Sequence, residues 1–237
     1  MNTGFEVFNE RGFKIIGSDY ANLVYYGKLM LTVQAGAKVS GIPWDAYATL
    51  PPNDSTLRFY RASFPCVEQA GLVRAPKDFI GAQIECYMFG PVKPAATSYG
   101  LELYTPDGAL TFNTARPFLR LLGVHVDPRN AMLDFQVGNG SYSPQDTGLR
   151  GQKLAWTVGN ARYFYRRTQF TGNSKYPNGF TDEFEAILAV SVADSGEYRN
   201  LAIQYGPTRR TSGWVGYGDH VPPTGPIRIL VADVAGL

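Results

Sequence analysis

The chain has few of the side chains from which most metal centres and acid–base sites are built. Among its 237 residues are only two histidines and two cysteines, and charged residues make up 18%. His125 and His220 stand far apart in the sequence, and neither has a histidine four residues away or a cysteine pair beside it. The sequence therefore predicts neither a zinc site nor a histidine-dependent catalytic triad.

Long apolar runs and a strong excess of one charge are missing as well. The longest apolar stretch, residues 186–193, contains Ser191 and is far shorter than a membrane-spanning helix. The first residues lack the basic and apolar segments of a secretory signal, so we expect a soluble protein made in the cytosol, without membrane insertion. A net charge of +2 is too small to predict nucleic acid as a partner. The absence of a heptad repeat excludes a coiled-coil shaft.

The two cysteines, Cys66 and Cys86, fall in different predicted strands among apolar neighbours. Because cytosolic proteins keep their thiols reduced, we expect both to be free, at least partly buried, and to act as small hydrophobic side chains. A disulfide between them is the less favoured alternative. A metal site would need further cysteine or histidine ligands.

Glycine, proline and aromatic residues are abundant instead, with 26 Gly, 16 Pro, 15 Tyr and 14 Phe. This composition is typical of turn-rich β structure. Short apolar runs between Gly, Pro, Asn and Ser clusters predict strands at 30–33, 57–62, 84–89, 132–137, 154–158, 162–167, 184–192, 201–205 and 227–231. The predicted fold is all-β, an antiparallel β-sandwich or jelly roll.

The most informative pattern is an internal duplication, because residues 4–27 align without a gap on residues 100–123. Five of the 24 aligned pairs are identical, where about one or two are expected by chance: Gly4/Gly100, Glu6/Glu102, Gly12/Gly108, Leu23/Leu119 and Gly27/Gly123. Apolar residues also recur at the same positions. We therefore predict that each copy forms the same β-hairpin followed by a third strand.

The turn of each hairpin ends in a glycine, Gly12 in the first copy and Gly108 in the second. In the second copy it reads Thr105-Pro106-Asp107-Gly108. Proline presets φ at the second turn position, and glycine accepts the positive φ that leads into the return strand. Gly12, Pro106, Asp107 and Gly108 are thus predicted structural turn residues.

The predicted boundaries follow this duplication. The Gly90–Pro94 segment is the expected linker before the second copy. We expect a β domain at residues 1–123 and a C-terminal β-sandwich at 124–237, either separate or packed as one unit.

Signals for enzymatic chemistry are weak. The sequence around Ser141 lacks the closing glycine of a nucleophile elbow, and the Gly-rich segment 213–218 is not followed by the Lys-Ser/Thr pair of a phosphate-binding loop. A glycosidase would need two carboxylates at a suitable separation. The candidates for that pair are Asp54, Asp182, Glu183, Glu185 and Asp219, and the aromatic residues that could stack on sugars are Trp44, Tyr47, Trp156, Trp214 and Tyr217.

Two long Gly/Pro-rich loops are predicted at residues 138–151 and 206–226. Aromatic residues and arginines dominate the energetics of protein interfaces, and long loops in compact domains usually have a function. We therefore expect the partner contacts to come from these loops, through Tyr142, Arg150, Arg209, Arg210, Trp214 and Tyr217.

The second copy of the motif, from Gly100-Leu101-Glu102 to Leu119-Arg120-Leu121-Leu122-Gly123, resembles a family of small structural proteins encoded among the tail genes of tailed bacteriophages and prophages. The resemblance extends over most of the first half and includes Phe89-Gly90. The first copy departs from the pattern at Tyr20-Ala21, where the second has Arg116-Pro117. The C-terminal half has no motif that we assign to a family.

This resemblance implies a component of the virion tail, at the tip, the baseplate or the fibre attachment, that is not an enzyme and needs no cofactor. Its partners would be other tail proteins and further copies of itself. The alternative function is a tail module that binds or depolymerises a glycan or receptor on the host surface. The face on which Asp182, Glu183 and Glu185 lie would discriminate between the two.

Overall fold

The computed structural model describes residues 6–8, 14–17, 22–36, 38–39, 42–43, 46–52, 57–92, 100–127, 145–159, 163–170, 174–175, 177–204, 209–212 and 227–237. Within these ranges the chain is built almost entirely of antiparallel strands, and the one helical segment is the 3-10 turn η1 (Lys77–Phe79). The all-β, sandwich-like fold expected from the sequence is confirmed.

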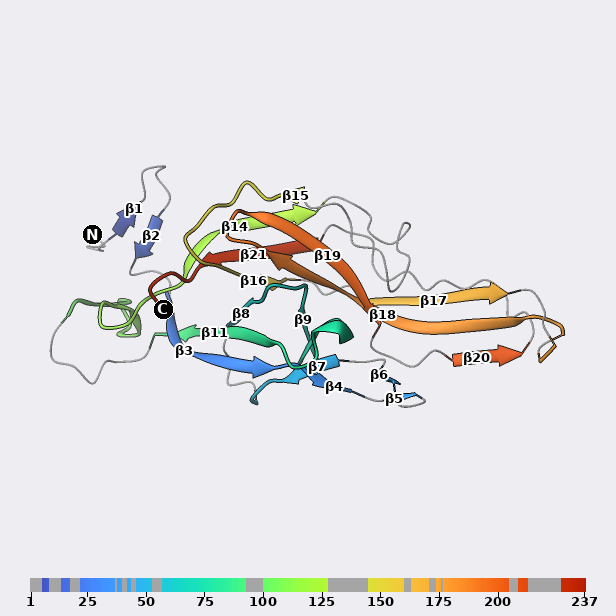
Figure 1. Cartoon of the computed structure of the whole chain (residues 1–237). Coiled ribbons are helices and arrows are strands. Elements are labelled where there is room, and N and C mark those ends of the chain that lie inside the picture. Colours follow the sequence, from blue (N-terminus) through green and yellow to red (C-terminus); the bar gives the residue numbers. More distant parts are fainter. Residues whose placement is uncertain are drawn as a thin grey trace.

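An inner sheet of six strands forms the centre of the molecule (Figure 1). Its order from one edge to the other is β14 (Arg120–Asp127), β21 (Ile227–Asp233), β16 (Leu154–Val158), β8 (Leu57–Arg61), β11 (Gln83–Pro91) and β3 (Leu23–Thr32). The sheet curls until its two edges meet. Tyr25 N–H donates to the Pro117 carbonyl and Leu119 N–H to the Leu23 carbonyl, both at 2.8 Å.

An outer layer covers one face of this sheet. One part has the order β4 (Gln34–Ala35), β7 (Ala46–Thr49), β10 (Leu72–Arg74) and β9 (Val67–Gln69). The other part has the order β15 (Gln145–Asp146), β19 (Glu197–Gln204), β18 (Phe180–Val192) and β17 (Tyr163–Phe170), with β20 (Arg209–Ser212) also paired to β18. A bridge between Cys66 and Val190 joins the two parts. A short pair, β5 (Lys38–Val39) with β6 (Ile42–Pro43), lies apart from them.

The two faces of the inner sheet form two cores because successive side chains alternate across a strand. Tyr60, Ile84 and Trp156 point toward the outer layer and are buried with its Leu188 and Val190. The opposite face, inside the curl, buries Phe59, Tyr87, Phe89, Ala155 and Ala232, together with Leu23 and Leu119 from the joined edges. Burial of each large side chain stabilises the fold by about 1.5–3 kcal/mol.

The two hairpins of the duplication have the same register. In the first hairpin, β1 (Glu6–Phe8) pairs with β2 (Lys14–Gly17) so that Val7 stands opposite Ile16. In the second, β12 (Glu102–Tyr104) pairs with β13 (Leu110–Asn113) so that Leu103 stands opposite Phe112, the corresponding pair. Both have a bulge directly after this pair. Gly108 has the predicted positive φ, 86°, whereas Gly12 lies outside the described residues.

The third strands share a second irregularity. β3 skips Tyr26 in its pairing with β11, and β14 skips Leu122 in its pairing with β21. Tyr26 and Leu122 are aligned in the duplication, and each precedes one of the aligned glycines, Gly27 and Gly123. The predicted hairpin-plus-strand duplication is therefore confirmed down to the positions of its bulges.

The structure extends this correspondence beyond the aligned sequence. Tyr25 and Leu121 are aligned in the duplication. Phe89 of β11 stands opposite Tyr25, and Ala232 of β21 stands opposite Leu121, so β11 corresponds to β21. β8 pairs with β11 as β16 pairs with β21. Counted from either edge, the inner sheet therefore has the same order of corresponding strands. We name residues 6–92 the first repeat and residues 100–237 the second repeat.

Three contacts between the repeats join corresponding residues, as a two-fold axis requires. At the joined edges, Leu119 stands opposite Leu23. In the middle of the inner sheet, the pairing of Tyr60 with Trp156 sets Phe59 opposite its counterpart Thr157. In the outer layer, Cys66 and Val190 exchange both backbone hydrogen bonds, at 2.9 and 3.2 Å.

Cys66 and Val190 correspond because of their places in two equivalent hairpins. Cys66 comes before the tight turn between β9 and β10, and Val190 comes before the turn between β18 and β19, which Ala193 and Glu197 close. The number of residues between each of them and its turn is the same. Outer strands also correspond, since β7 pairs with β10 as β15 pairs with β19. The fold is thus a two-layered pair of repeats about one pseudo-two-fold axis.

Several predicted boundaries shift. The Gly90–Pro94 linker is wrong at its start, because Gly90 and Pro91 belong to β11 and pair with β3. The expected boundary after Gly123 lies inside β14, and strands from both expected parts belong to the inner sheet. The strand predicted at 132–137 lies outside the described residues. The loops predicted at 138–151 and 206–226 contain the short strands β15 and β20.

Candidate functional site

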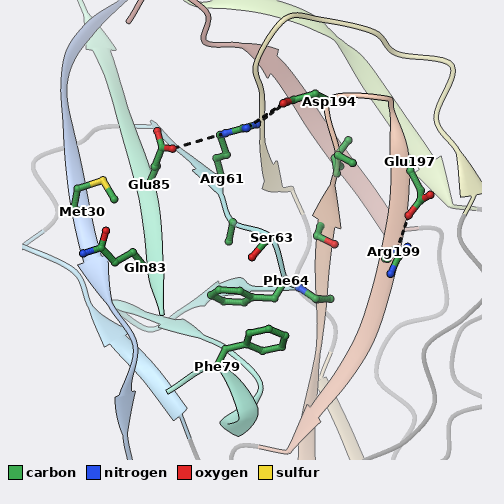
Figure 2. A pocket seen from close by; sticks show the side chains of 15 residues that line it. Met30, Arg61, Ser63, Phe64, Phe79, Gln83, Glu85, Asp194, Glu197 and Arg199 are labelled. Atoms are coloured by element: carbon green, nitrogen blue, oxygen red, sulfur yellow. Dashed lines mark hydrogen bonds and ion pairs between the residues drawn. The ribbon is translucent and has the colours of Figure 1, made fainter. Parts of the chain in front are cut away.

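A pocket of about 720 Å³ opens where the inner sheet meets both parts of the outer layer. We name it the junction pocket. Figure 2 shows Met30, Gln83 and Glu85 on one side of it and Glu197 and Arg199 on the other. Its volume lies within the ~300–1,000 Å³ range of small-molecule sites. The remaining lining residues are Arg61, Ala62, Ser63, Phe64, Pro65, Phe79, Ser191, Val192, Ala193 and Asp194.

Arg61, at the end of β8, connects the two repeats at this pocket. Its guanidinium forms a bidentate pair with Asp194, with Nη1–Oδ1 at 2.5 Å and Nη2–Oδ2 at 3.0 Å, and also donates to the Leu154 carbonyl at 3.3 Å. Asp194 accepts a further hydrogen bond from Leu154 N–H at 2.7 Å. Because two parallel hydrogen bonds fix a planar guanidinium, the turn between β18 and β19 is held against the end of β8.

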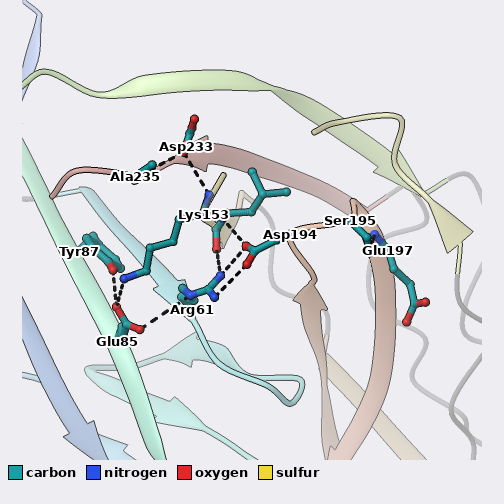
Figure 3. Close-up of polar contacts among 10 residues, drawn as sticks. Arg61, Glu85, Tyr87, Lys153, Asp194, Ser195, Glu197, Asp233 and Ala235 are labelled. Carbon is teal, nitrogen blue, oxygen red and sulfur yellow. Dashed lines mark hydrogen bonds and ion pairs between the residues drawn. The ribbon is translucent and has the colours of Figure 1, made fainter. Parts of the chain in front are cut away.

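Glu85 of β11 is the second anchor (Figure 3). It accepts hydrogen bonds from the Tyr87 hydroxyl and from Lys153 Nζ, the latter at 2.9 Å. Lys28 Nζ lies 3.6 Å and Arg61 Nε 3.8 Å from its carboxylate. Four donors or cations thus surround one acid, and the network places two carboxylates and three basic groups in fixed relative positions.

These contacts set the protonation states. Burial alone would raise the pKa of Glu85, but hydrogen bonds from Tyr87 and Lys153 and the nearby ammonium charges outweigh it and lower that pKa. Burial likewise opposes ionisation of Asp194, and hydrogen bonds from Arg61 and Leu154 N–H reverse the effect and lower its pKa. Both acids are therefore ionised at neutral pH, and neither can donate a proton.

The apolar part of the pocket has an aromatic pair. Phe64 and Phe79 stack with ring centroids 4.3 Å apart and an interplanar angle of 16°. Phe64 is buried, and Met30, which also lines the pocket, is 50% exposed. The pocket therefore combines a fixed polar network with apolar surface.

A second cavity, of about 520 Å³, lies beside the second hairpin and residues 233–237. Phe112 and Phe118 line it with ring centroids 5.9 Å apart. Arg120 Nη1 lies 3.7 Å from Asp233 Oδ2 in the same cavity. Apolar atoms dominate its wall, and this one ion pair is its main polar feature.

The predicted partner-contact residues do not form one surface in the described part of the chain. Arg150 is exposed but forms a bidentate pair with Asp146, which holds the pKa of that acid at about 2. Arg209 and Arg210 lie in strand β20 and not in a loop, opposite Glu183 and Asp182 of β18. Tyr142, Trp214 and Tyr217 lie outside the described residues.

The structure also shows where several of the other residues singled out in the sequence lie. Pro106 and Asp107 form the predicted turn, closed by Gly108 N–H donating to the Thr105 carbonyl at 2.9 Å. Trp156 is a buried core residue, and His125 packs against the Tyr198 ring. Tyr47 of β7 has the Arg74 guanidinium over its ring at 5.8 Å.

Cys66 and Cys86 are free and buried, as predicted, and burial raises the pKa of Cys86 to about 12. The candidates outside the described residues are Trp44, Asp54, Ser141, Asp219 and His220.

Arg61, Glu85 and Asp194 escaped the sequence analysis because they are far apart in the chain and belong to no motif. The repeat offers the one usable signal, since at the positions of Arg61 and Glu85 the second repeat has Gly159 and Arg228. That correspondence becomes visible only once the strands are paired.

In the part of the chain that the structure describes, no helix has the length and apolarity to cross a membrane. The same residues contain no group of three acidic, histidine or cysteine side chains arranged to hold a metal ion. No family model, no curated protein and no solved structure matches the chain.

Proposed function

We propose that this protein is a non-enzymatic structural component of a bacteriophage tail, which assembles in the tip, baseplate or fibre-attachment region. The observation that carries the proposal is the duplicated unit. The motif that resembles the tail-protein family runs from Gly100 to Gly123, and its last residues, Leu119 to Gly123, contribute to the joint between the two edges of the inner sheet and to the bulge of β14. In this chain the motif builds a scaffold.

A free apolar edge supports an assembling role. No strand pairs with the outer side of β14 beyond the joint among the described residues. Leu121, Val124 and Val126 lie on one face of this strand and are 47, 49 and 45% exposed. Edge strands that remain unpaired in a finished protein usually have charged side chains or proline, and the stretch from Leu121 to Val126 has neither. The edge is therefore suited to pair with another tail protein or another copy.

The state of the acids favours a scaffold over an enzyme that cleaves glycans. Glycoside hydrolysis needs one protonated carboxylic acid beside a carboxylate. Glu85 and Asp194 both have lowered pKa values.

The test is the composition of purified particles. Tailed virions from the strain that encodes this chain should contain it at a fixed copy number by quantitative mass spectrometry, at one end of the tail by electron microscopy. Deletion of the gene should leave particles with incomplete tails. Complete, infectious particles without the protein would refute the proposal.

The predicted contact residues give a second test of the same proposal. A Trp214→Ala and Arg210→Ala double variant should remain folded and should enter particles less efficiently. Normal incorporation with loss of host binding would favour the receptor function instead.

A further inference from the structure

We propose that the junction pocket is a binding site for a neutral glycan, which it holds without cleaving. The inference goes beyond a scaffolding role and does not depend on it, because it rests on the lining of the pocket alone. It assigns to the molecule a ligand site formed jointly by its two repeats.

The charges of the pocket are balanced within the protein. Arg61 is paired with Asp194, and Lys153 is paired with Glu85. Arg199 is paired with Glu197, with 2.5 Å between Arg199 Nε and Glu197 Oε1. An ionic ligand would have to displace one of these partners. A neutral ligand can use the lone pairs that Asp194 and Glu197 keep after pairing, since each carboxylate has about four acceptor sites and the contacts of these two acids fill fewer than four. This requirement selects a ligand rich in hydroxyl groups.

Neutral polar groups and apolar surface complete the fit. Ser63 and Gln83 line the pocket with exposed side chains that can both donate and accept hydrogen bonds. Met30, Pro65 and the Phe64–Phe79 stack supply apolar area on the same pocket. A sugar ring has hydroxyl groups around its rim and C–H groups on its faces, so one pocket can satisfy both. The volume of about 720 Å³ admits a short oligosaccharide.

The pocket is specific to one side of the pseudo-two-fold axis. At the corresponding positions on the other side, Gly159 replaces Arg61, Arg228 replaces Glu85 and Val126 replaces Met30. If the pocket were only a by-product of how the two layers meet, both corners would have similar linings. The repeats have instead diverged at the residues that give the pocket its chemistry.

The ionised acids account for binding without cleavage. Neither Glu85 nor Asp194 can serve as the proton donor that glycoside hydrolysis requires. Both are held by Arg61, so their carboxylates also lack the freedom to approach a sugar carbon. A bound glycan would remain intact.

The experiment uses the full chain on a glycan array that contains neutral and charged bacterial oligosaccharides. We expect binding to neutral members, and titration calorimetry with the best neutral oligosaccharide should give the affinity. Ser63→Trp, which places an indole in the mouth of the pocket, should weaken that affinity at least tenfold. Gln83→Ala removes one hydrogen-bonding group and should weaken it about threefold to tenfold.

Gln34→Ala is the matched control, because Gln34 is an exposed glutamine on β4 outside the pocket. It should leave the affinity within about twofold, and circular dichroism should show that all three variants fold. Binding to charged glycans only, binding to none at millimolar concentration, or unchanged binding by Ser63→Trp would overturn the proposal. Shortened oligosaccharide after incubation would overturn the claim that the ligand stays intact.

The outcome of the glycan-binding experiment is independent of the proposed role in a phage tail. Ser63→Trp should enter particles normally if the pocket binds only a glycan. Failure of incorporation with intact glycan binding in the wild type would place the pocket in assembly as well and leave the glycan site standing.

Discussion

The two edge strands of the inner sheet, β3 and β14, occupy corresponding positions in the two repeats and differ in what they expose. On the face turned into the curl, β3 has Tyr25, Lys28 and Met30, and β14 has Leu121, Val124 and Val126 at the corresponding positions. Lys28 of β3 lies near Glu85 and over the Tyr87 ring. β14 has no charged residue at these three positions. The first repeat thus has a polar network on this face of its edge strand, while the second has an exposed apolar one.

The comparison separates what the fold requires from what each repeat does with it. Both repeats keep the hairpin register, the bulges and the contacts on the axis, because these determine where the strands meet. They differ in the side chains around that framework. Function should therefore be sought where the repeats have diverged, and stability where they agree.

The largest expected effect concerns the central contact on the axis. Phe59→Ala removes a fully buried ring that packs against Phe89 and should lower the free energy of unfolding by about 3–5 kcal/mol. Thr157→Ala changes the half-buried counterpart and should lower it by less than about 1 kcal/mol. Urea unfolding would measure both. Equal losses would show that the two halves of the axis contribute alike.

The next effect concerns the duplicated turn. Gly108 has φ of 86° and open space around the position of a Cβ atom, so only backbone strain opposes a side chain there. Gly108→Val should destabilise the protein by about 1–3 kcal/mol. Ala109→Val, at the exposed neighbour without positive φ, is the control and should change stability by less than about 0.5 kcal/mol. An unchanged melting temperature for Gly108→Val would contradict the turn assignment.

The open edge makes a prediction about association. Val124→Lys introduces into β14 the residue that β3 has at the same position, and it should weaken self-association at least tenfold, by about 1.4 kcal/mol. Met30→Lys on β3 is the control, because Met30 is as exposed as Val124. Sedimentation velocity over a concentration series would measure the effect. If both variants associated like the wild type, the β14 edge would not be the contact.

The smallest expected effect concerns pH. Because the folded-state pKa of Glu85 is lowered, its charge stabilises the fold above the unfolded pKa of about 4.3, and this contribution is lost as the pH falls through the folded-state value. Glu85→Gln should therefore reduce stability at pH 7 and flatten its decline below about pH 4. Gln34→Ala, at an exposed residue of β4 that takes no part in the Glu85 network, should leave the shape of the pH curve unchanged. Thermal melts from pH 2 to 7 would test both.

Local sequence patterns were sufficient for most of the longer strands and for the duplicated hairpin. The short apolar runs at 154–158 and 227–231 and the Pro106-Asp107-Gly108 turn depend on neighbouring residues, so they can be recognised in the linear chain. The hairpin between β9 and β10 was missed because its turn, Ala70-Gly71, lacks the Asn-Gly or Asp-Gly pair that marks such turns.

The pocket and the extent of the repeat could not be found in this way. Arg61 and Asp194 are separated by more than half of the chain, and no spacing rule connects them. β8 and β16 share almost no residue types, so only their pairing reveals the correspondence. Long connections of different length, 62–82 in the first repeat and 159–226 in the second, further obscure the alignment.

The three contacts on the axis also bear on how such a protein can change. In a symmetric dimer of separate half-length chains, a residue on the axis faces its own copy, so every substitution there occurs twice in the same place. Joining the halves in one polypeptide removes that constraint. Leu23 still faces a leucine, but Phe59 faces Thr157 and Cys66 faces Val190. A large side chain on one side can then be matched by a small one on the other, a packing solution that two identical chains could never reach.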